Sequence, residues 1–189
     1  MNRNVAAAGA LAAALALALL AASIFGRAGE VITLYHVPPA FEAEWRSGEV
    51  PPDRWVGFAL DEAGWELLDG MVPGGLGQAG PAGFDRYVAL VAYMGERPTG
   101  GYAIQIREVV YEERGEAGGK LRVRLAVDSP DPSHFVTQAF TYPFDVAILE
   151  RESLLEELLE RLDAGGLAAE VVDQDGRDWG PLRVARSGS

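Results

Sequence analysis

One uninterrupted apolar run constrains the fold more than any other stretch of this chain. Residues 87–94 read Tyr-Val-Ala-Leu-Val-Ala-Tyr-Met, with no charged residue among them. A strand that exposes one face to water alternates apolar and polar residues, whereas a strand covered on both faces does not. The run therefore predicts a central β-strand with structure packed on both of its faces.

The residues that follow predict a turn and then an irregular strand. Residues 95–101 contain three glycines and one proline, which are turn-forming residues. Ile104 and Ile106 then alternate with polar residues, but residues 109–111 are consecutively apolar. A β-bulge near Glu108 would explain this shift of the pattern.

Further strands are predicted in the second half of the core. Residues 121–128 alternate between apolar and polar side chains, as a half-exposed strand does. The segments 135–142 and 144–148 are rich in aromatic and β-branched residues and complete the set. Because the connections between successive strands are short, we expect a mainly antiparallel meander or a sandwich-like sheet.

The chain before the core predicts two strands and one short helix. Residues 30–35 and 54–60 have strand composition. Asp61 stands where a helix N-cap belongs, and Gly70 stands where the helix would end. Trp65, Leu67 and Leu68 would form the apolar side of this helix. The segment 72–83 carries five glycines and two prolines, which favours a flexible loop.

The chain after the core predicts a second helix and one more strand. From Ser153, leucines recur at helical spacing opposite charged residues, so the leucine stripe is expected to dock on the sheet. Residues 167–172 suit a strand. The segment 173–178 partly resembles a calcium loop, but Val184 stands where the loop's glutamate belongs, and a polar turn is predicted. The Arg-Ser-Gly-Ser end, residues 186–189, is expected to be frayed.

These elements predict an α+β fold, mainly antiparallel β, with a short helix before the core and a helix after it. We predict that the chain has three parts. Residues 1–29 form a signal peptide or membrane anchor, and residues 30–150 form a β-rich domain. Residues 151–189 contain the second helix, a possible strand and the tail. Residues 5–25 form a run of 21 apolar or small residues after one positive charge. A signal peptide's apolar region takes ~7–15 residues and a bilayer span ~20, so we expect export with an uncleaved anchor or a cleaved signal. The predicted location is extracytoplasmic, with membrane contact only through this segment.

The composition excludes several classes of function. The net charge is −12 with Lys and Arg scattered singly, which argues against nucleic acid as a partner. The chain has no cysteine, so disulfides, thiolate metal sites and a Cys nucleophile are excluded. His36 and His134 lie far apart and neither has a metal-ligand spacing. No metal, no cofactor and no enzymatic activity are predicted.

The turn after the apolar run is the one candidate contact site. Proline presets a turn angle and glycine permits positive φ, so turn architecture alone accounts for these residue types. A rigid exposed loop would also bind a protein at low entropic cost, and Arg and Tyr are favoured interface anchors. The candidate protein-contact residues are Arg97, Pro98, Thr99, Gly100, Gly101, Tyr102, Tyr142 and Pro143.

The same residues carry a resemblance to a known family. Residues 91–104 (Val-Ala-Tyr-Met-Gly-Glu-Arg-Pro-Thr-Gly-Gly-Tyr-Ala-Ile), then 121–125 and the Thr-Tyr-Pro-Phe of 141–144, resemble the PrcB C-terminal-like family, over roughly residues 56–149. The family takes its name from a subunit of a bacterial cell-surface protease complex. The resemblance implies an exported, non-catalytic accessory domain that stabilises or assembles an extracytoplasmic protease.

A second resemblance suggests a different role. Residues 97–102 look like the Asn-Pro-Thr-Thr-Gly-Tyr loop of chagasin-type protease inhibitors, with Arg97 in place of Asn and Gly100 in place of the second Thr. Residues 74–75 and 178–180 would have to supply the other inhibitor loops, although their order and spacing differ. Direct protease inhibition is therefore an alternative function, and a structural role in the cell envelope is a further one.

Overall fold

The computed structural model describes residues 30–32, 34–37, 53–113, 119–133, 135–151, 153–164 and 167–188. Val31–Ser189 forms one compact unit, separate from Met1–Glu30, and the fold below is that of this unit. The predicted signal peptide or anchor lies outside the described residues. None of the helices that the structure describes is long and apolar enough to cross a bilayer.

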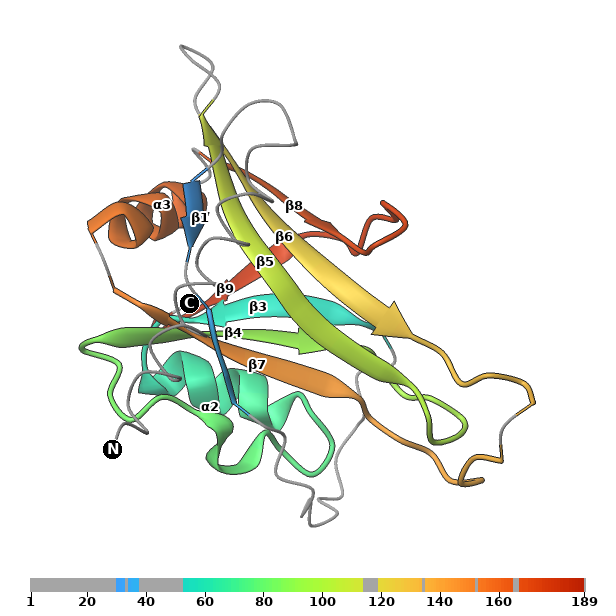
Figure 1. Ribbon diagram of the computed structural model, residues 1–189. Helices are drawn as coiled ribbons and strands as arrows, with labels where there is room; N and C mark the ends of the chain where they lie inside the picture. The colour runs from blue at the N-terminus through green and yellow to red at the C-terminus, as the bar shows by residue number, and fades with distance from the viewer. Residues whose placement is uncertain are drawn as a thin grey trace, which may run out of the picture. The chain divides into compact units, whose positions relative to one another are not determined.

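In the part of the chain that the structure describes, nine strands form two sheets (Figure 1). The four-stranded sheet has the order β1 (Glu30–Ile32), β5 (Ala103–Glu113), β6 (Gly119–Asp128) and β8 (Ala168–Val172). The five-stranded sheet has the order β2 (Tyr35–Val37), β7 (Phe144–Glu150), β4 (Tyr87–Tyr93), β3 (Trp55–Ala59) and β9 (Leu182–Ala185). The described helices are α2 (Glu62–Gly70), α3 (Ser153–Asp163) and the 3-10 turn η1 (Gly77–Ala79).

The predicted fold class is confirmed. The pairs β2–β7, β4–β7, β3–β4 and β5–β6 are antiparallel, while β6–β8 and β3–β9 are parallel. Successive strands do not all pair in one sheet. The chain leaves the five-stranded sheet after β4, forms the β5–β6 hairpin in the other sheet, and returns as β7 beside β4. Of the two arrangements expected, the structure has the sandwich-like one.

The central strand is buried on both faces, as predicted. Alternate residues of β4 belong to two separate apolar clusters. Val88 and Leu90 face the four-stranded sheet and pack in the cluster of Ile106 and Val123. The opposite face of β4 packs with Leu68 of α2. The five-stranded sheet is thus covered by the other sheet on one side and by α2 on the other.

The predicted bulge is present in β5. Ile106 pairs with Leu125 and Glu108 pairs with Arg124, so Arg107 is an extra residue opposite β6. This places the bulge one residue before the expected position. A bulge turns the side chains that follow it to the other face, which returns Val109 to the core at 0% exposure.

Helix α2 begins and ends where the sequence predicts. Asp61 is its N-cap, and Oδ1 of Asp61 accepts a 2.7 Å hydrogen bond from the N–H of Gly64. The buried residues of the helix are Gly64 and Leu68, four positions apart on one face. Leu67 does not join that face as expected, because it points to the solvent with 53% of its surface exposed.

The glycine-rich segment after α2 packs on the five-stranded sheet, in contrast to the flexible loop that was expected. Val72, Leu76 and Ala79 are each at most 3% exposed and belong to the cluster beneath α2. Oδ1 of Asp69 accepts a 2.6 Å hydrogen bond from the N–H of Leu76 and fixes the segment to the helix.

Residues after the core contribute to both sheets. Leu158 and Leu159 of α3 are buried against the sheets, which confirms that the leucine stripe docks on them. The predicted strand at residues 167–172 is β8. Strand β9 was not predicted, and it pairs in parallel with β3. Consecutive strands therefore form the sheet edges, β1 with β2 at one end of each sheet and β8 with β9 at the other.

Candidate protein-contact site

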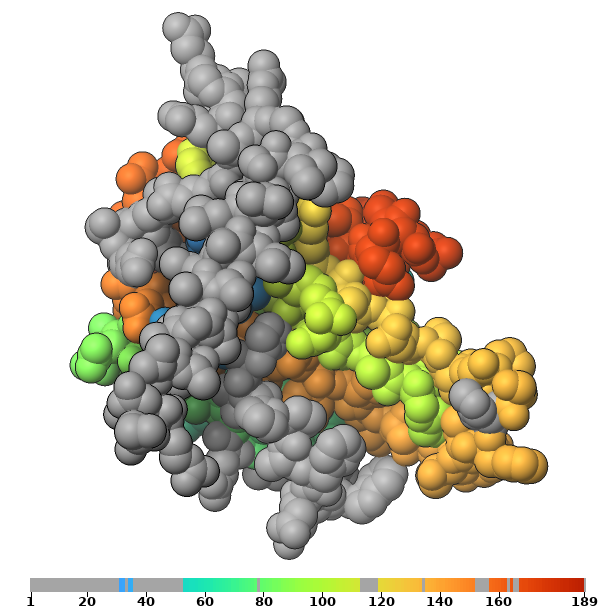
Figure 2. Space-filling model, in the orientation of Figure 1, coloured from blue at the N-terminus to red at the C-terminus, as the bar shows by residue number. Residues whose placement is uncertain are grey.

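The predicted turn is joined by hydrogen bonds to a second segment, and we call residues 94–102 and 129–143 the paired loops. The backbone N–H of Arg97 donates to the carbonyl of Thr141 at 2.8 Å, and the N–H of Thr141 donates back at 2.9 Å. The Gly100 N–H donates to the Thr137 carbonyl at 2.8 Å, and the Thr141 hydroxyl donates to the Thr99 carbonyl at 2.8 Å. These four hydrogen bonds, together with two more described below, hold the two loops as one projecting surface (Figure 2).

Arg97 and Tyr102 lie at the base of this surface. One Nη of Arg97 donates to the carbonyl of Met94 at 2.6 Å, and the guanidinium lies 5.7 Å from the centroid of the Tyr102 ring. Both residues are half-buried. Their contacts serve the turn itself, whereas Pro98 and Gly101 of the same turn are exposed.

Tyr142 and Pro143 come together with the turn as well. The Tyr142 hydroxyl donates to a carboxylate oxygen of Glu96 at 3.1 Å. The carbonyl of Pro143 accepts a 2.9 Å hydrogen bond from the N–H of Met94. All eight residues singled out in the sequence therefore belong to the paired loops.

Two features of the structure require glycine at position 101. Its φ is +83°, which other residues rarely adopt. A Cβ atom at this position would lie 2.9 Å from Cβ of Pro130 and 3.0 Å from Cγ1 of Val136. The close approach of the two loops depends on the missing side chain.

Two phenols lie at the junction of the loops and the sheet. Burial, assisted by the nearby Tyr142 and Glu96, raises the pKa of Tyr93 to about 12. Burial and the hydrogen bond to Glu96 also raise the pKa of Tyr142. Both hydroxyls therefore carry their protons at neutral pH, which removes them as general bases.

The second loop carries two exposed aromatic side chains that sequence reasoning missed. Phe135 is 108% exposed and Phe140 is 57% exposed. The strand predicted over residues 135–142 is wrong, because Thr141 makes only an isolated bridge to the first loop. The odd spacing of Phe135 and Phe140 was an available signal. In a strand such residues point to opposite faces, so a strand with only one buried face would expose one of them.

The two segments that would have to supply the other loops of a chagasin-type inhibitor, residues 74–75 and 178–180, are packed against the rest of the domain. Trp179 of the segment 178–180 is only 5% exposed and belongs to the core cluster. Gly75 lies against Asp69, where an added Cβ would be 2.8 Å from a carboxylate oxygen. Both segments serve packing.

The calcium-like segment forms a polar turn, as predicted. Oδ1 of Asp173 accepts hydrogen bonds of 2.9 Å from the N–H groups of Asp175 and Arg177. Burial alone would raise the pKa of Asp173, but these hydrogen bonds outweigh it and lower the pKa. Across the described ranges, no three His, Cys, Asp or Glu side chains are grouped to hold a metal ion. His134 lies outside those ranges.

The fold and the paired loops define a mainly β domain that presents a rigid two-loop surface. Residues 88–150 match the family described as PrcB C-terminal, so the predicted resemblance is confirmed over this part of the chain. The match runs from β4 to β7 and includes both of the paired loops in full. It indicates a subunit related to a protease complex, with a protein as partner. No curated protein and no solved structure matches the chain.

Proposed function

We propose that this chain is an exported, non-catalytic accessory subunit that stabilises an extracytoplasmic protease and contacts it through the paired loops. The family match supports the protease-related role, because it spans the loops and the strands that carry them. The apolar residues 5–25 support export.

The exposure of Phe135 and Phe140 is the observation that carries the proposal. Large aromatic side chains are favoured anchors of protein interfaces. Burying each of them in a partner would contribute about 1.5–3 kcal/mol. The hydrogen bonds between the loops fix this surface before binding, which lowers the entropic cost of association.

The chemistry of the loops favours binding over catalysis. The Ser133 hydroxyl donates to Oδ1 of Asp131 at 2.7 Å, which is the one Ser–carboxylate pair among the loop residues described. Hydrogen bonds from the Ser133 N–H and hydroxyl lower the pKa of Asp131. A carboxylate with a lowered pKa is a weaker base, so this pair is poorly suited to activate a nucleophile.

A pull-down with matched variants tests the proposal. The full-length chain should capture a protease from a solubilised membrane fraction. The double variant Phe135→Ser with Phe140→Ser should lose it while keeping the wild-type melting temperature, because both side chains are exposed. Leu67→Ser is the control, since Leu67 is an exposed large apolar residue on α2, away from the loops. Capture of no protease by the wild type would refute the role. Equal capture by the double variant would refute the contact surface.

Export has a separate test. An epitope placed after residue 188 should be digested by protease added outside intact cells or spheroplasts. Mass spectrometry of the purified chain should show whether residues 1–29 remain, which separates an anchor from a cleaved signal. Protection of the epitope until the membrane is lysed would contradict export.

Direct inhibition is the second candidate, because a projecting rigid turn suits insertion into a cleft. Titration of the chain into cysteine and serine protease assays tests it. Inhibition that Pro98→Ala and Gly100→Asn weaken together would favour this candidate, and unchanged protease activity at micromolar chain would remove it.

A further inference from the structure

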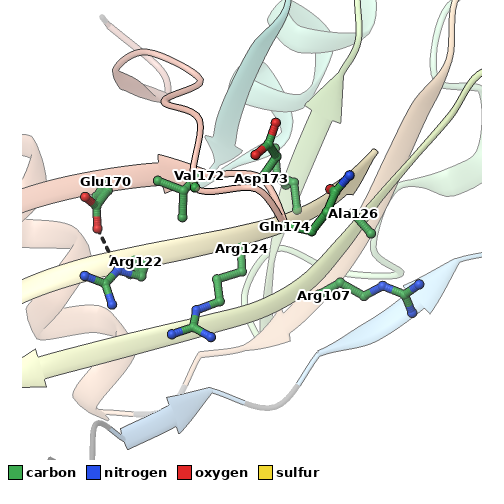
Figure 3. A pocket seen from close by; sticks show the side chains of 10 residues that line it. Arg107, Arg122, Arg124, Ala126, Glu170, Val172, Asp173 and Gln174 are labelled. Carbon is green, nitrogen blue, oxygen red and sulfur yellow. Dashed lines mark hydrogen bonds and ion pairs between the residues drawn. The ribbon is translucent and has the colours of Figure 1, made fainter. Parts of the chain in front are cut away.

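The outer face of the four-stranded sheet contains a hollow of about 710 Å3 (Figure 3). Ala126 and Val172 give it an apolar lining, and the turn after β8 bounds it. The Gln174 side chain fixes this boundary. Its amide donates to the carbonyl of Val127 at 2.8 Å and accepts from the Val127 N–H at 2.9 Å, as a further strand residue would.

One acidic residue of the lining is already balanced by positive charge. Oε2 of Glu170 lies 2.8 Å from Nζ of Lys120 and 2.6 Å from Nε of Arg122. Hydrogen bonds from Lys120 and Arg122 lower the pKa of Glu170, so it is ionised at neutral pH. Arg122 also forms an ion pair with Glu112, with 2.6 Å between Nη1 of Arg122 and Oε1 of Glu112. This ion-pair cluster leaves little net charge for a ligand.

The other acidic residue of the lining is turned away. The Asp173 side chain is 5% exposed, and its carboxylate caps the turn after β8 through the N–H groups of Asp175 and Arg177. It therefore does not neutralise the guanidinium groups around the hollow.

Two arginines remain with spare hydrogen-bonding capacity. Arg107 is the extra residue of the bulge; it is exposed and makes no hydrogen bond or ion pair within the described residues. Nε of Arg124 lies 3.4 Å from Oε2 of Glu108, and the Arg124 side chain is 45% exposed. Figure 3 shows the two guanidinium groups pointing to opposite sides. Positive charge is thus presented at two separate points.

We propose that this hollow binds an extended acidic peptide segment of a protein partner, with Arg107 and Arg124 each receiving a carboxylate. Arginine donates paired hydrogen bonds that match a carboxylate. Two diverging guanidinium groups suit a ligand that carries its charges at intervals along its length. The apolar lining between them suits the side chains that alternate with those carboxylates. This surface is separate from the paired loops, so the proposal does not depend on the function proposed for them.

The charges around the hollow favour a carboxylate over a phosphate as the ligand. Glu108 and Glu170 lie close to the arginines, and they would repel a dianion more strongly than a singly charged group. The chain's net charge of −12 also opposes ligands of high negative charge density. The volume lies within the roughly 300–1,000 Å3 of ligand pockets, well above the size of one small anion.

Fluorescence anisotropy on the full-length chain in detergent tests the proposal. The probe is a fluorescein-labelled peptide of sequence Glu-Val-Asp-Val-Glu-Val, and the neutral comparison is Gln-Val-Asn-Val-Gln-Val. We expect the acidic probe to bind and the neutral one to bind at least about tenfold more weakly, since each lost charge-assisted contact costs on the order of 1.5 kcal/mol. Arg107→Gln with Arg124→Gln should weaken binding of the acidic probe by a similar factor.

Two further variants separate binding from folding. Ala126→Glu adds a carboxylate to the lining that would engage the arginines internally, and it should abolish binding at an unchanged melting temperature. Arg183→Gln removes an exposed arginine from β9 and should bind the probe as the wild type does. Equal binding of the neutral peptide, no binding of the acidic probe at millimolar chain, or unchanged binding by the double variant would overturn the proposal. Displacement by inorganic phosphate at concentrations equal to the peptide would replace it with a simple anion site.

Discussion

The carboxylate of Asp145 in β7 accepts a 2.7 Å hydrogen bond from the backbone N–H of Ile106 in β5, and so one buried side chain joins the two sheets. The donor is the residue before the bulge, and its N–H points to the other sheet. Asp145 is 8% exposed. A buried polar contact of this kind is a stability determinant, because breaking it leaves a buried N–H without an acceptor.

Removing this carboxylate should lower the stability of the domain. We expect Asp145→Ala to reduce the free energy of unfolding by about 2–3 kcal/mol, and Asp145→Asn to cost less because its amide oxygen still accepts. Urea denaturation monitored by circular dichroism measures both. Asp128→Ala, at an exposed position, is the control and should change little. Equal losses for Asp145→Ala and Asp128→Ala would contradict the role of the inter-sheet bond.

The contact between α2 and β9 should tolerate no side chain at Gly64. A Cβ there would lie 2.1 Å from the carbonyl oxygen of Ala185, whereas nothing lies within 4 Å of a Cβ at Gly70 in the same helix. Gly64→Ala should therefore destabilise by several kcal/mol through forced displacement of β9. Gly70→Ala should be neutral or stabilising by up to about 1 kcal/mol, because alanine favours helix. Thermal melts of the two variants should differ in direction, and a shared direction would argue against the close packing.

The paired loops should respond in the same way to alanine at Gly101. Gly101 and Gly176 both have positive φ, but only at Gly101 would the new Cβ meet another segment. Gly176→Ala should cost about 1 kcal/mol from backbone strain alone. Gly101→Ala should cost more and should raise amide hydrogen exchange at Gly100 and Thr141. Equal exchange in the two variants would show that the loops do not depend on this contact.

Tyr93 should make stability fall at high pH. Its pKa is about 12 in the folded chain against an ordinary value of 10.0. The unfolded chain therefore loses this proton first, so the contribution is complete below pH 10 and is lost as the pH rises toward 12. Between pH 9 and 11 the wild type should lose about 1 kcal/mol more than Tyr93→Phe. Parallel pH dependences in guanidinium denaturation would contradict the raised pKa.

Local features of the fold could be predicted from sequence, because they follow from nearby residues. The lack of polar residues in β4 predicted that both of its faces are buried. The shift in the alternation of apolar and polar residues before Val109 predicted the bulge, and Asp61 predicted the start of α2. Pairing partners could not be predicted. Periodicity tells which face of a strand is buried but not which strand lies beside it, and β4 pairs with β7 more than 50 residues later. Strand β9 is only four residues long, which is too short for an alternation of apolar and polar residues to be recognised in the sequence.

Of the paired loops, only the conformation of the first could be predicted from the sequence. Turn chemistry located Pro98, Gly100 and Gly101, since proline and glycine report directly on backbone conformation. The second loop was misread because phenylalanine and threonine suit strands by composition. Its backbone instead bonds to the first loop, and that long-range contact has no local signature. The exposed Phe135 and Phe140 thus emerged only with the three-dimensional arrangement.

The parallel pairing of β9 with β3 has a consequence for how the chain reaches its native state. Val56 lies opposite Leu182, 126 positions later, and Tyr35 lies opposite Ile148. Contacts between residues so far apart in the sequence slow folding, because a long loop must close before any stabilisation is gained. During synthesis the edge of β3 stays open until Ala185 has emerged, and open strand edges are prone to aggregate. We therefore expect this chain to rely on being held unfolded while it is made, and to fold in one late step.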